Sequence, residues 1–406
     1  MKAERYADLG HLSDLIAPPY DIISPGERAL LAARSPHNIV HLIVPEQDGD
    51  PYGNAARQLQ QWRRDGILVP DSTPAAYVLR QDYSAPDGSR CSRTGVFLAL
   101  AAEPYRLGRV RPHEHTHSGP KADRLALLEA TATMLESIFV LARDKSGELR
   151  GLLAEAVSAP PLARAELAGV GLTIWRAQGK LADQIAVVAG RDPLYIADGH
   201  HRFETADAYR SRNPHAARTV ALVVPVGDPG LQVLATHRLI IGPRLPESEV
   251  VAALAQDFEI DAVESASDPA SLLARPGSER IAALVALPPG RVLSATIRQS
   301  ARKETSASVA SRLNISVVDR LIVNRLRELA GPGPQGKLGY SPDAAAVLRE
   351  LREDRAAAAV LVKPTGVEEV LAVADAGEVM PPKSTYFLPK VPSGLVLLPL
   401  ASVAES

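Results

Sequence analysis

The sequence lacks the features that mark several large classes of protein. It holds one cysteine, Cys91, so neither an intrachain disulfide framework nor a zinc site built from several thiolates can form. No stretch approaches the roughly 18 uninterrupted apolar residues that a membrane-spanning helix needs. The first residues are charged, without the apolar core of a signal peptide. We therefore expect a cytoplasmic protein with no membrane partner.

An excess of charge of one sign is also absent. Lys and Arg number 45 and Asp and Glu number 47, which gives a net charge of -2. Binding to nucleic acid depends largely on basic residues that neutralise phosphates, so we expect no nucleic-acid partner. A local basic pocket for a small anion is compatible with this balance. Aromatic residues are few, at 4%, but the 46% of hydrophobic residues is ordinary for a globular chain.

The chain of 406 residues is too long for one compact core, so two or three domains are expected. We expect an N-terminal α/β segment over residues 1–72, a central core over 73–245 and a C-terminal α/β domain over 246–406. Short apolar runs alternate with amphipathic stretches through the chain, which favours the α/β class.

Four local patterns predict particular elements. Ser24 and Pro25 have the residue types of an N-cap and a first helical position, so a helix should begin there. The apolar run 38–44 predicts a strand. Residues 76–101 predict a hairpin around a turn that contains Pro and Gly. Apolar residues at helical spacing predict a helix over 121–135.

The most informative stretch is Asp198-Gly199-His200-His201-Arg202. A short apolar strand ends here, the glycine permits a sharp turn, and a helix begins. A helix start has unpaired amide N–H groups and the positive end of the helix dipole, and two imidazoles and a guanidinium are added at the same place. We therefore expect an exposed turn that binds phosphate. The alternative is an N-cap aspartate followed by solvated polar residues.

A second polar cluster begins at His113-Glu114. Glu114 could act as a general base, because a carboxylate near a substrate hydroxyl can accept its proton. His113, His115 and His117 would face one way on an extended chain, so a transition-metal site is an alternative. The third interpretation is a solvated loop that caps the following helix.

Three further segments carry polar side chains that could contribute to the site from a second layer. Each also has a structural interpretation, as an exposed strand end, a solvent-facing loop or a loop that braces the site. The residues concerned are His237 and Arg238, Lys383 and Ser384, and Tyr20 and Asp21.

Four of these motifs occur in a fixed order along the chain. They are Pro18-Pro19-Tyr20-Asp21-Ile22-Ile23-Ser24, His113-Glu114-His115-Thr116, Asp198-Gly199-His200-His201-Arg202 and Lys383-Ser384-Thr385-Tyr386-Phe387-Leu388-Pro389-Lys390. On these motifs the chain resembles, over nearly its whole length, the bacterial and archaeal family named domain of unknown function 1015.

A more distant resemblance bears on function. The His-Glu loop, the helix that carries Asp123-Arg124-Leu125 and the Asp-Gly-His-His-Arg turn resemble the core of the ParB/sulfiredoxin-like fold, in which the free-serine kinases are the nearest functional match. This resemblance implies an α/β (α+β) fold. It would be a ParB/sulfiredoxin-like mixed-sheet core with an insertion and with N-terminal and C-terminal α/β additions. It further implies that Glu114 is the base and that the turn holds nucleotide phosphates.

We therefore expect a kinase, dependent on ATP or ADP, that phosphorylates the hydroxyl of a small amino acid, serine first. The expected roles are catalysis by Glu114, Asp198 and His200, nucleotide or phosphate binding by Gly199, His201, Arg202, His113 and Thr116, and coordination of Mg²⁺ by Asp198. The alternatives are a phosphatase acting on a phosphorylated metabolite, a ParB-like nucleotide switch and the histidine metalloprotein. The sequence leaves the oligomeric state open, with a homodimer as one option.

Overall fold

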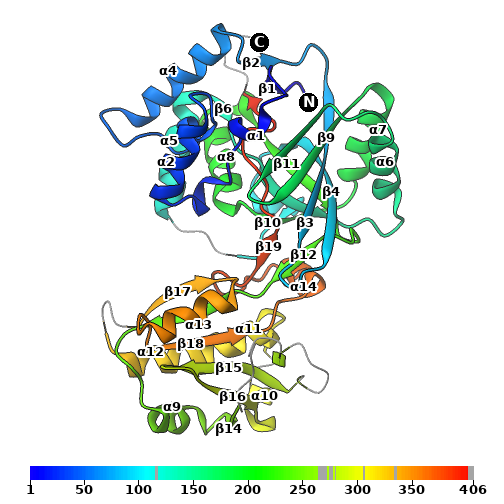
Figure 1. The fold of residues 1–406 in the computed structure, drawn as a ribbon. Coiled ribbons are helices and arrows are strands. Elements are labelled where there is room, and N and C mark those ends of the chain that lie inside the picture. The colour runs from blue at the N-terminus through cyan, green and yellow to red at the C-terminus, as the bar shows by residue number, and fades with distance from the viewer. Residues whose placement is uncertain are drawn as a thin grey trace. The chain divides into compact units, whose positions relative to one another are not determined.

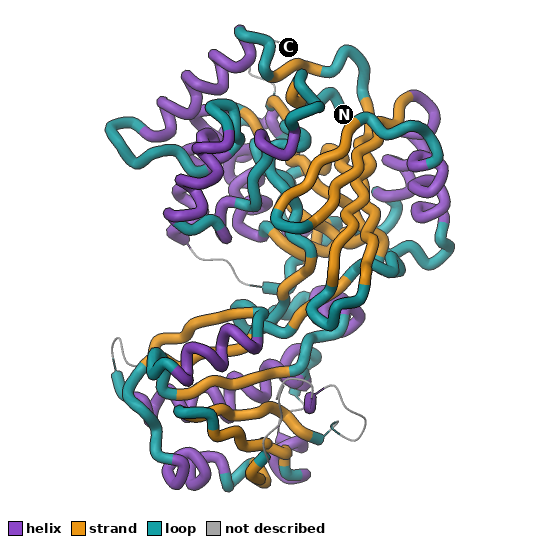
Figure 2. Tube along the Cα trace, viewed as in Figure 1, coloured by secondary structure: helices purple, strands orange, loops and turns teal. Residues whose placement is uncertain are grey.

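The computed structural model describes residues 1–114, 118–263, 272, 273, 278, 280–304, 307–332 and 336–400. The chain divides into two compact units (Figures 1 and 2). Unit 1 consists of Met1–Pro112, Thr116–Gln232 and Pro389–Ser406, and unit 2 consists of His113–His115 and Val233–Leu388. Unit 2 is therefore largely an insertion in the chain of unit 1. The three-part division at residues 72 and 245 stays a prediction about separately folding domains.

Unit 1 is built on an eight-stranded mixed sheet. Its strands, in spatial order, are β5 (Val110–Arg111), β10 (Leu194–Asp198), β7 (Ile138–Ala142), β11 (Arg218–Pro225), β4 (Arg90–Ala101), β3 (Ala75–Ser84), β9 (Val170–Gln178) and β8 (Ala163–Leu167). The predicted hairpin over 76–101 is confirmed as β3 and β4. Strand β10 lies between β5, to which it is parallel, and β7, to which it is antiparallel, so its end is placed by two neighbours.

The helices of unit 1 lie against this sheet or against one another. They are α1 (Leu12–Leu15), α2 (Pro25–Arg34), α3 (Val40–Ile43), α4 (Pro51–Arg64), α5 (Ser118–Thr131), α6 (Glu148–Val157), α7 (Gly179–Ala189) and α8 (His200–Arg212). Helices α6 and α7 contact β3 and β9, whereas α8 contacts β7, β11 and α5 (Figure 1). Two small sheets, β1 (Glu4–Tyr6) with β2 (Leu68–Pro70) and β6 (Thr133–Met134) with β20 (Leu398–Pro399), complete the unit.

Local sequence signals decide where several helices begin and end. Helix α2 begins as predicted, with Ser24 as N-cap, Pro25 in the first turn and a reciprocal capping box with Glu27. The predicted helix over 121–135 is α5, which ends earlier, at Thr131. The next residue, Ala132, has φ of 47°, a left-handed conformation that a continuing helix does not allow.

The strand predicted for residues 38–44 is wrong, because the chain forms the short helix α3 there. The Asn38 side chain accepts a hydrogen bond from the Val40 amide and donates two, to the carbonyl oxygens of Asp14 and Ile16. These contacts turn the backbone, and the apolar residues that suggested a strand are buried in unit 1 instead. Tertiary contacts here override β propensity.

Unit 2 contains a six-stranded antiparallel sheet of its own. Its strands, in spatial order, are β14 (Phe258–Ala262), β16 (Arg291–Ile297), β15 (Ile281–Leu287), β18 (Ala358–Val362), β13 (His237–Ile241) and β17 (Lys337–Ser341). The described helices are α9 (Glu247–Leu254), α10 (Gln299–Glu304), α11 (Asn314–Val318), α12 (Asn324–Ala330), α13 (Ala344–Arg352) and α14 (Val367–Asp375). A π-helical turn over Asp319–Val323 joins α11 to α12, and β12 (Gln232–Leu234) pairs with β19 (Tyr386–Leu388).

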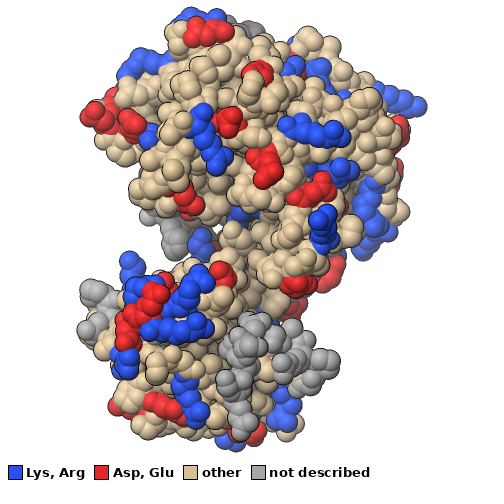
Figure 3. All heavy atoms as spheres, viewed as in Figure 1, with Lys and Arg blue, Asp and Glu red and all other residues tan. Residues whose placement is uncertain are grey.

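The α/β class with a mixed sheet, predicted from the sequence, is confirmed. Among the described residues, no helix combines the length and apolar character that crossing a bilayer requires. Basic and acidic side chains are interspersed over the face of each unit that Figure 3 draws.

Candidate functional site

The turn after β10 has the local structure that the sequence predicts. Strand β10 ends at Asp198, Gly199 has φ of 90°, and α8 begins at His200. A side chain at Gly199 would be strained by this φ, and its Cβ would lie only 2.9 Å from Nε of Arg202. Glycine therefore serves two purposes here, because it allows the turn and leaves room for the guanidinium.

The carboxylate of Asp198 is held between two cations. Its Oδ2 accepts a hydrogen bond of 2.8 Å from Nη2 of Arg202, and its Oδ1 accepts one of 2.9 Å from Nζ of Lys390. Burial by itself raises the pKa of Asp198, but the ammonium of Lys390 and the guanidinium of Arg202 outweigh it, so the pKa lies well below its usual range. Asp198 is thus firmly ionised in the folded protein.

The turn is not exposed, contrary to the expectation from the sequence. Arg202 is 5% exposed, and its Nη1 also donates to the carbonyl oxygen of Ser137 at the start of the neighbouring strand. His200 is buried too, at 9%, whereas His201 is half-buried. Arg202 therefore supports the fold as well as supplying charge, and the His201 side chain is the more accessible of the two.

The first motif of the sequence also belongs to this part of unit 1. The backbone amide of Tyr20 donates to Oε1 of Glu136, and the guanidinium of Arg124 lies 4.1 Å from the centre of the Tyr20 ring. Burial raises the pKa of Tyr20 to about 12. Tyr20 and Asp21 both contribute to the raised pKa of Arg202, after the larger effects of burial, which opposes the rise, and of Asp198 and Glu136. The structure therefore brings the first and third motifs together.

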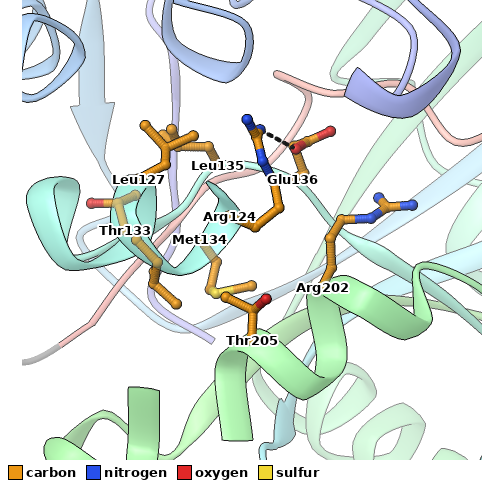
Figure 4. Close-up of a pocket in the computed structure, with 9 residues that line it drawn as sticks. Arg124, Leu127, Thr133, Met134, Leu135, Glu136, Arg202 and Thr205 are labelled. Carbon is orange, nitrogen blue, oxygen red and sulfur yellow. Dashed lines mark ion pairs between the residues drawn. The ribbon is translucent and has the colours of Figure 1, made fainter. Parts of the chain in front are cut away.

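A small cavity of about 40 Å³ adjoins these residues. Its lining combines charged and apolar side chains from α5, α8 and the segment that follows α5, namely Arg124, Leu127, Leu128, Thr133, Met134, Leu135, Glu136, Arg202 and Thr205 (Figure 4). Arg124 and Glu136 form an ion pair of 3.5 Å in it. The hydroxyl of Thr205 is buried and has no hydrogen-bond partner among the described residues.

The second and fourth motifs meet in unit 2. Oε1 of Glu114 accepts a hydrogen bond of 2.9 Å from the backbone amide of Lys383, which has φ of 58°. His113 is fully buried, and its Nε2 lies 3.1 Å from Oγ1 of Thr385. His113 thus anchors the loop through Thr385, and its predicted contact with nucleotide stays a prediction. Thr116, with His115 and His117, lies outside the described residues.

The other predicted residues of unit 2 have clear structural partners. Arg238 is fully buried and pairs with Asp319 in the π-helical turn through Nε and Nη2, at 2.9 and 3.2 Å. Nδ1 of His237 accepts from the Val362 amide, and the Ser384 hydroxyl donates to the Pro381 carbonyl oxygen. These contacts stabilise unit 2, and the second-layer roles assigned to the same residues stay predictions.

Asp198 is poorly arranged for the predicted Mg²⁺. Lys390 and Arg202 already place positive charge against its two oxygens, and a divalent cation added there would be repelled by both. Among the described residues no group of three His, Cys, Asp or Glu side chains is placed to hold a metal ion. The residues present do not fit the ion, and coordination by Asp198 would require one of the cations to move away.

Sequence reasoning overlooked Glu136 and Arg93, and it considered Lys390 as an anion ligand without placing it at this turn. Lys390 stands in the fourth motif, but its contact with Asp198 joins residues 192 positions apart, which no local pattern reveals. Arg93 lies 1% exposed within strand β4, and Glu136 lies 6% exposed just before β7. A charged residue at an inward position of a strand was the available signal for Arg93.

Comparison with known proteins gives one family and several distant structures. A variant of free serine kinase in complex with AMP has 13% sequence identity and a TM-score of 0.41, and covers 72% of this chain and 87% of its own. A conserved hypothetical protein from Pyrococcus furiosus has 14% identity and a TM-score of 0.38, covering 73% and 93%. A C-terminally truncated SbnI from Staphylococcus aureus has 10% identity and a TM-score of 0.37, covering 75% and 87%.

The comparison with curated proteins gives no match. The family model described as protein of unknown function, DUF1015, matches residues 1–319, which is well over half of the sequence. The motifs on which the sequence resembled this family include the Asp198–Arg202 turn and the Tyr20–Asp21 loop, which the structure brings together in unit 1. The chain belongs to the DUF1015 family.

Proposed function

We propose that this protein binds the phosphates of a nucleotide, ATP or ADP, at the turn Asp198–Arg202 and transfers a phosphoryl group to the hydroxyl of a small amino acid, serine first. The choice of donor and acceptor rests on the resemblance of the sequence motifs to the free-serine kinases. The choice of place rests on the geometry of the turn.

One observation carries the proposal, namely the gathering of cationic side chains where α8 begins. Arg202 and Lys390 contact Asp198, and His200 lies close enough to lower the pKa of that carboxylate. The backbone amides at the start of the 13-residue helix add the positive end of its dipole. Asp198 thus has two cationic partners, and the helix start adds its amide N–H groups, which together can attract an anion.

The chemistry needed from these residues is mainly positioning and charge stabilisation. Phosphoryl transfer passes through a state with negative charge spread over the phosphoryl oxygens, which fixed cations and amide N–H groups can stabilise. His201 and Arg202 would contact the phosphates, and Gly199 would let them approach the backbone. Glu114 is proposed as the group that accepts the proton of the acceptor hydroxyl, a role separate from phosphate binding.

The proposal is tested by a screen of ATP, ADP and other nucleotides against hydroxy amino acids, read by ³¹P NMR. Appearance of a phosphomonoester signal that depends on both nucleotide and amino acid is the expected result. Nucleotide binding in calorimetry without phosphorylation of any acceptor would instead favour a nucleotide-binding switch. Release of phosphate from phosphoserine in the absence of nucleotide would favour a phosphatase.

A further inference from the structure

We infer that Lys390 is a ligand of the bound phosphate, held against Asp198 until the anion arrives. The inference rests on the proposed function for the identity of the anion. It extends that function by adding a phosphate ligand from a different part of the chain. Lys390 lies beyond residue 319, where the match to the family model ends. The site would therefore be completed by a segment outside the matched stretch.

The backbone around Lys390 is fixed on both sides by buried polar groups. The carbonyl oxygen of Pro389 accepts a hydrogen bond of 2.7 Å from Nη2 of Arg93. The carbonyl oxygen of Lys390 accepts one of 3.0 Å from Nε2 of Gln81. Arg93 and Gln81 are each 1% exposed, stand opposite each other on β4 and β3, and hydrogen-bond to one another. Two interior side chains thus hold this short segment in one place.

Burying the polar pair Arg93 and Gln81 in the interior of a sheet costs free energy, which indicates that the position of residues 389 and 390 matters. Burial lowers the pKa of Arg93 to about 10, a sign of how much water the guanidinium has lost. Its charge is offset in part by the face of the Phe139 ring, 4.5 Å away. Apolar residues at positions 81 and 93 would pack in the sheet without this cost. They could not, however, hydrogen-bond to the backbone of residues 389 and 390.

The fixed backbone directs the ammonium of Lys390 to Asp198. The pair is 2.9 Å long, and the two side chains are 14% and 16% exposed. Arg202 already pairs with Asp198, so the carboxylate keeps one cationic partner when Lys390 leaves it. Lysine suits a ligand that must move, because its ammonium is carried on a flexible stem, whereas Arg202 is also fixed by the Ser137 carbonyl oxygen.

Binding requires only a change of partners and no covalent step. A phosphate oxygen that enters at the start of α8 would take the hydrogen bonds of Lys390, and Asp198 would keep its contact with Arg202. Asp198 then acts as a substitute anion that keeps Lys390 oriented while the site is empty, which lowers the entropy lost when the ligand binds.

The test is calorimetry with inorganic pyrophosphate and with ADP on the full chain. Lys390→Met removes the charge but keeps the length of the side chain, and Lys390→Gln also keeps a hydrogen-bond donor for Asp198, so the test does not depend on the folding of one variant. Lys121→Met is the matched control. Lys121 also forms an ion pair of 2.8 Å, but with Glu204, which lies further along α8. Melting temperatures show which variants are folded.

We expect pyrophosphate to bind about 10-fold to 100-fold more weakly to both Lys390 variants, and equally well to Lys121→Met. Unchanged pyrophosphate affinity in a folded Lys390 variant would overturn the inference. A wild-type chain that binds ADP while the variants bind it equally well would reject the inference and keep the proposed function. If the wild type binds pyrophosphate but no nucleotide, and the Lys390 variants bind pyrophosphate more weakly, the inference is kept and the proposed function is rejected. Failure of the wild type to bind either probe would overturn both.

Discussion

Two of the sequence motifs each contain a carboxylate, Asp198 and Glu114, and the two carboxylates have different kinds of partner in the structure. Asp198 of unit 1 faces two cations, Lys390 and Arg202. Glu114 of unit 2 accepts a hydrogen bond from the backbone amide of Lys383. The first carboxylate is part of a cluster of formal charges, and the second is oriented by the main chain.

The difference separates two chemical roles. A carboxylate whose pKa is lowered binds protons weakly, so Asp198 is a poor general base but a strong anchor for cations. Glu114 is the proposed proton acceptor because its motif resembles that of the free-serine kinases, and the Lys383 amide orients its carboxylate. Substitutions at the two carboxylates and at their partners test this division.

Glu114→Gln should lower turnover by about 10²-fold to 10⁴-fold, because the amide keeps the shape of the side chain but cannot accept the proton. Nucleotide affinity should hardly change, since phosphate binding is assigned to the turn at Asp198. Steady-state kinetics and calorimetry on one preparation provide the measurement. Near-normal turnover with a lowered melting temperature would show that Glu114 only stabilises its loop.

Asp198→Asn should lower the free energy of unfolding at neutral pH by about 3–5 kcal/mol, because Lys390 and Arg202 lose the carboxylate that compensates their buried charge. The pKa of Asp198 is lower in the folded protein, so its ionisation adds stability above a pH of about 4 and loses that contribution as the pH falls further. Urea unfolding between pH 7 and 3 should therefore show a weaker acid dependence in the variant. The same pH dependence of unfolding in the wild type and the variant would mean that the contacts of Asp198 with Lys390 and Arg202 do not stabilise the protein.

His201→Ala should weaken nucleotide binding by about 10-fold to 100-fold, the value of one charge-assisted hydrogen bond, with little loss of stability. Arg202→Ala is the instructive contrast, because that side chain is 5% exposed and also holds Ser137. It should lose both affinity and stability. Calorimetry together with thermal melting distinguishes the two variants, and unchanged affinity in both would remove the turn from the site.

Thr385→Val should cost about 1 kcal/mol of stability, because it removes the hydrogen bond between the Thr385 hydroxyl and the buried ring of His113 while conserving volume. Glu114 follows His113 in the chain. Turnover should therefore fall only if the loss of the His113 contact displaces Glu114. Chemical denaturation measures the first effect and kinetics the second. A loss of turnover as large as that of Glu114→Gln would mean that the His113 anchor itself takes part in the reaction.

Local patterns predicted the turn well because its determinants are adjacent in sequence. A strand end, a glycine with positive φ and a helix start occupy consecutive positions, so Asp198 to Arg202 could be recognised without long-range information. The capped start of α2 at Ser24 was predicted for the same reason. These elements are decided by neighbours within one or two turns of chain.

The failures share a dependence on distant contacts. The helix at Val40–Ile43 forms where hydrogen bonds from Asn38 to residues 14 and 16 turn the chain, and an apolar run alone cannot show this. Burial of Arg202 depends on Ser137, and the pairing of Asp198 depends on Lys390. Hydrophobic periodicity reports which face of an element is buried and not which charged group it will meet.

The contact between Asp198 and Lys390 closes a loop of 192 residues that contains nearly all of unit 2. While unit 2 is unfolded, closing this loop costs more entropy than when its chain is already compact, because closure entropy grows with the length of flexible chain. During synthesis, the turn and α8 leave the ribosome long before Lys390 is made. The Lys390 contact should therefore be among the last parts of unit 1 to form, and it should close at a lower entropy cost once unit 2 has folded.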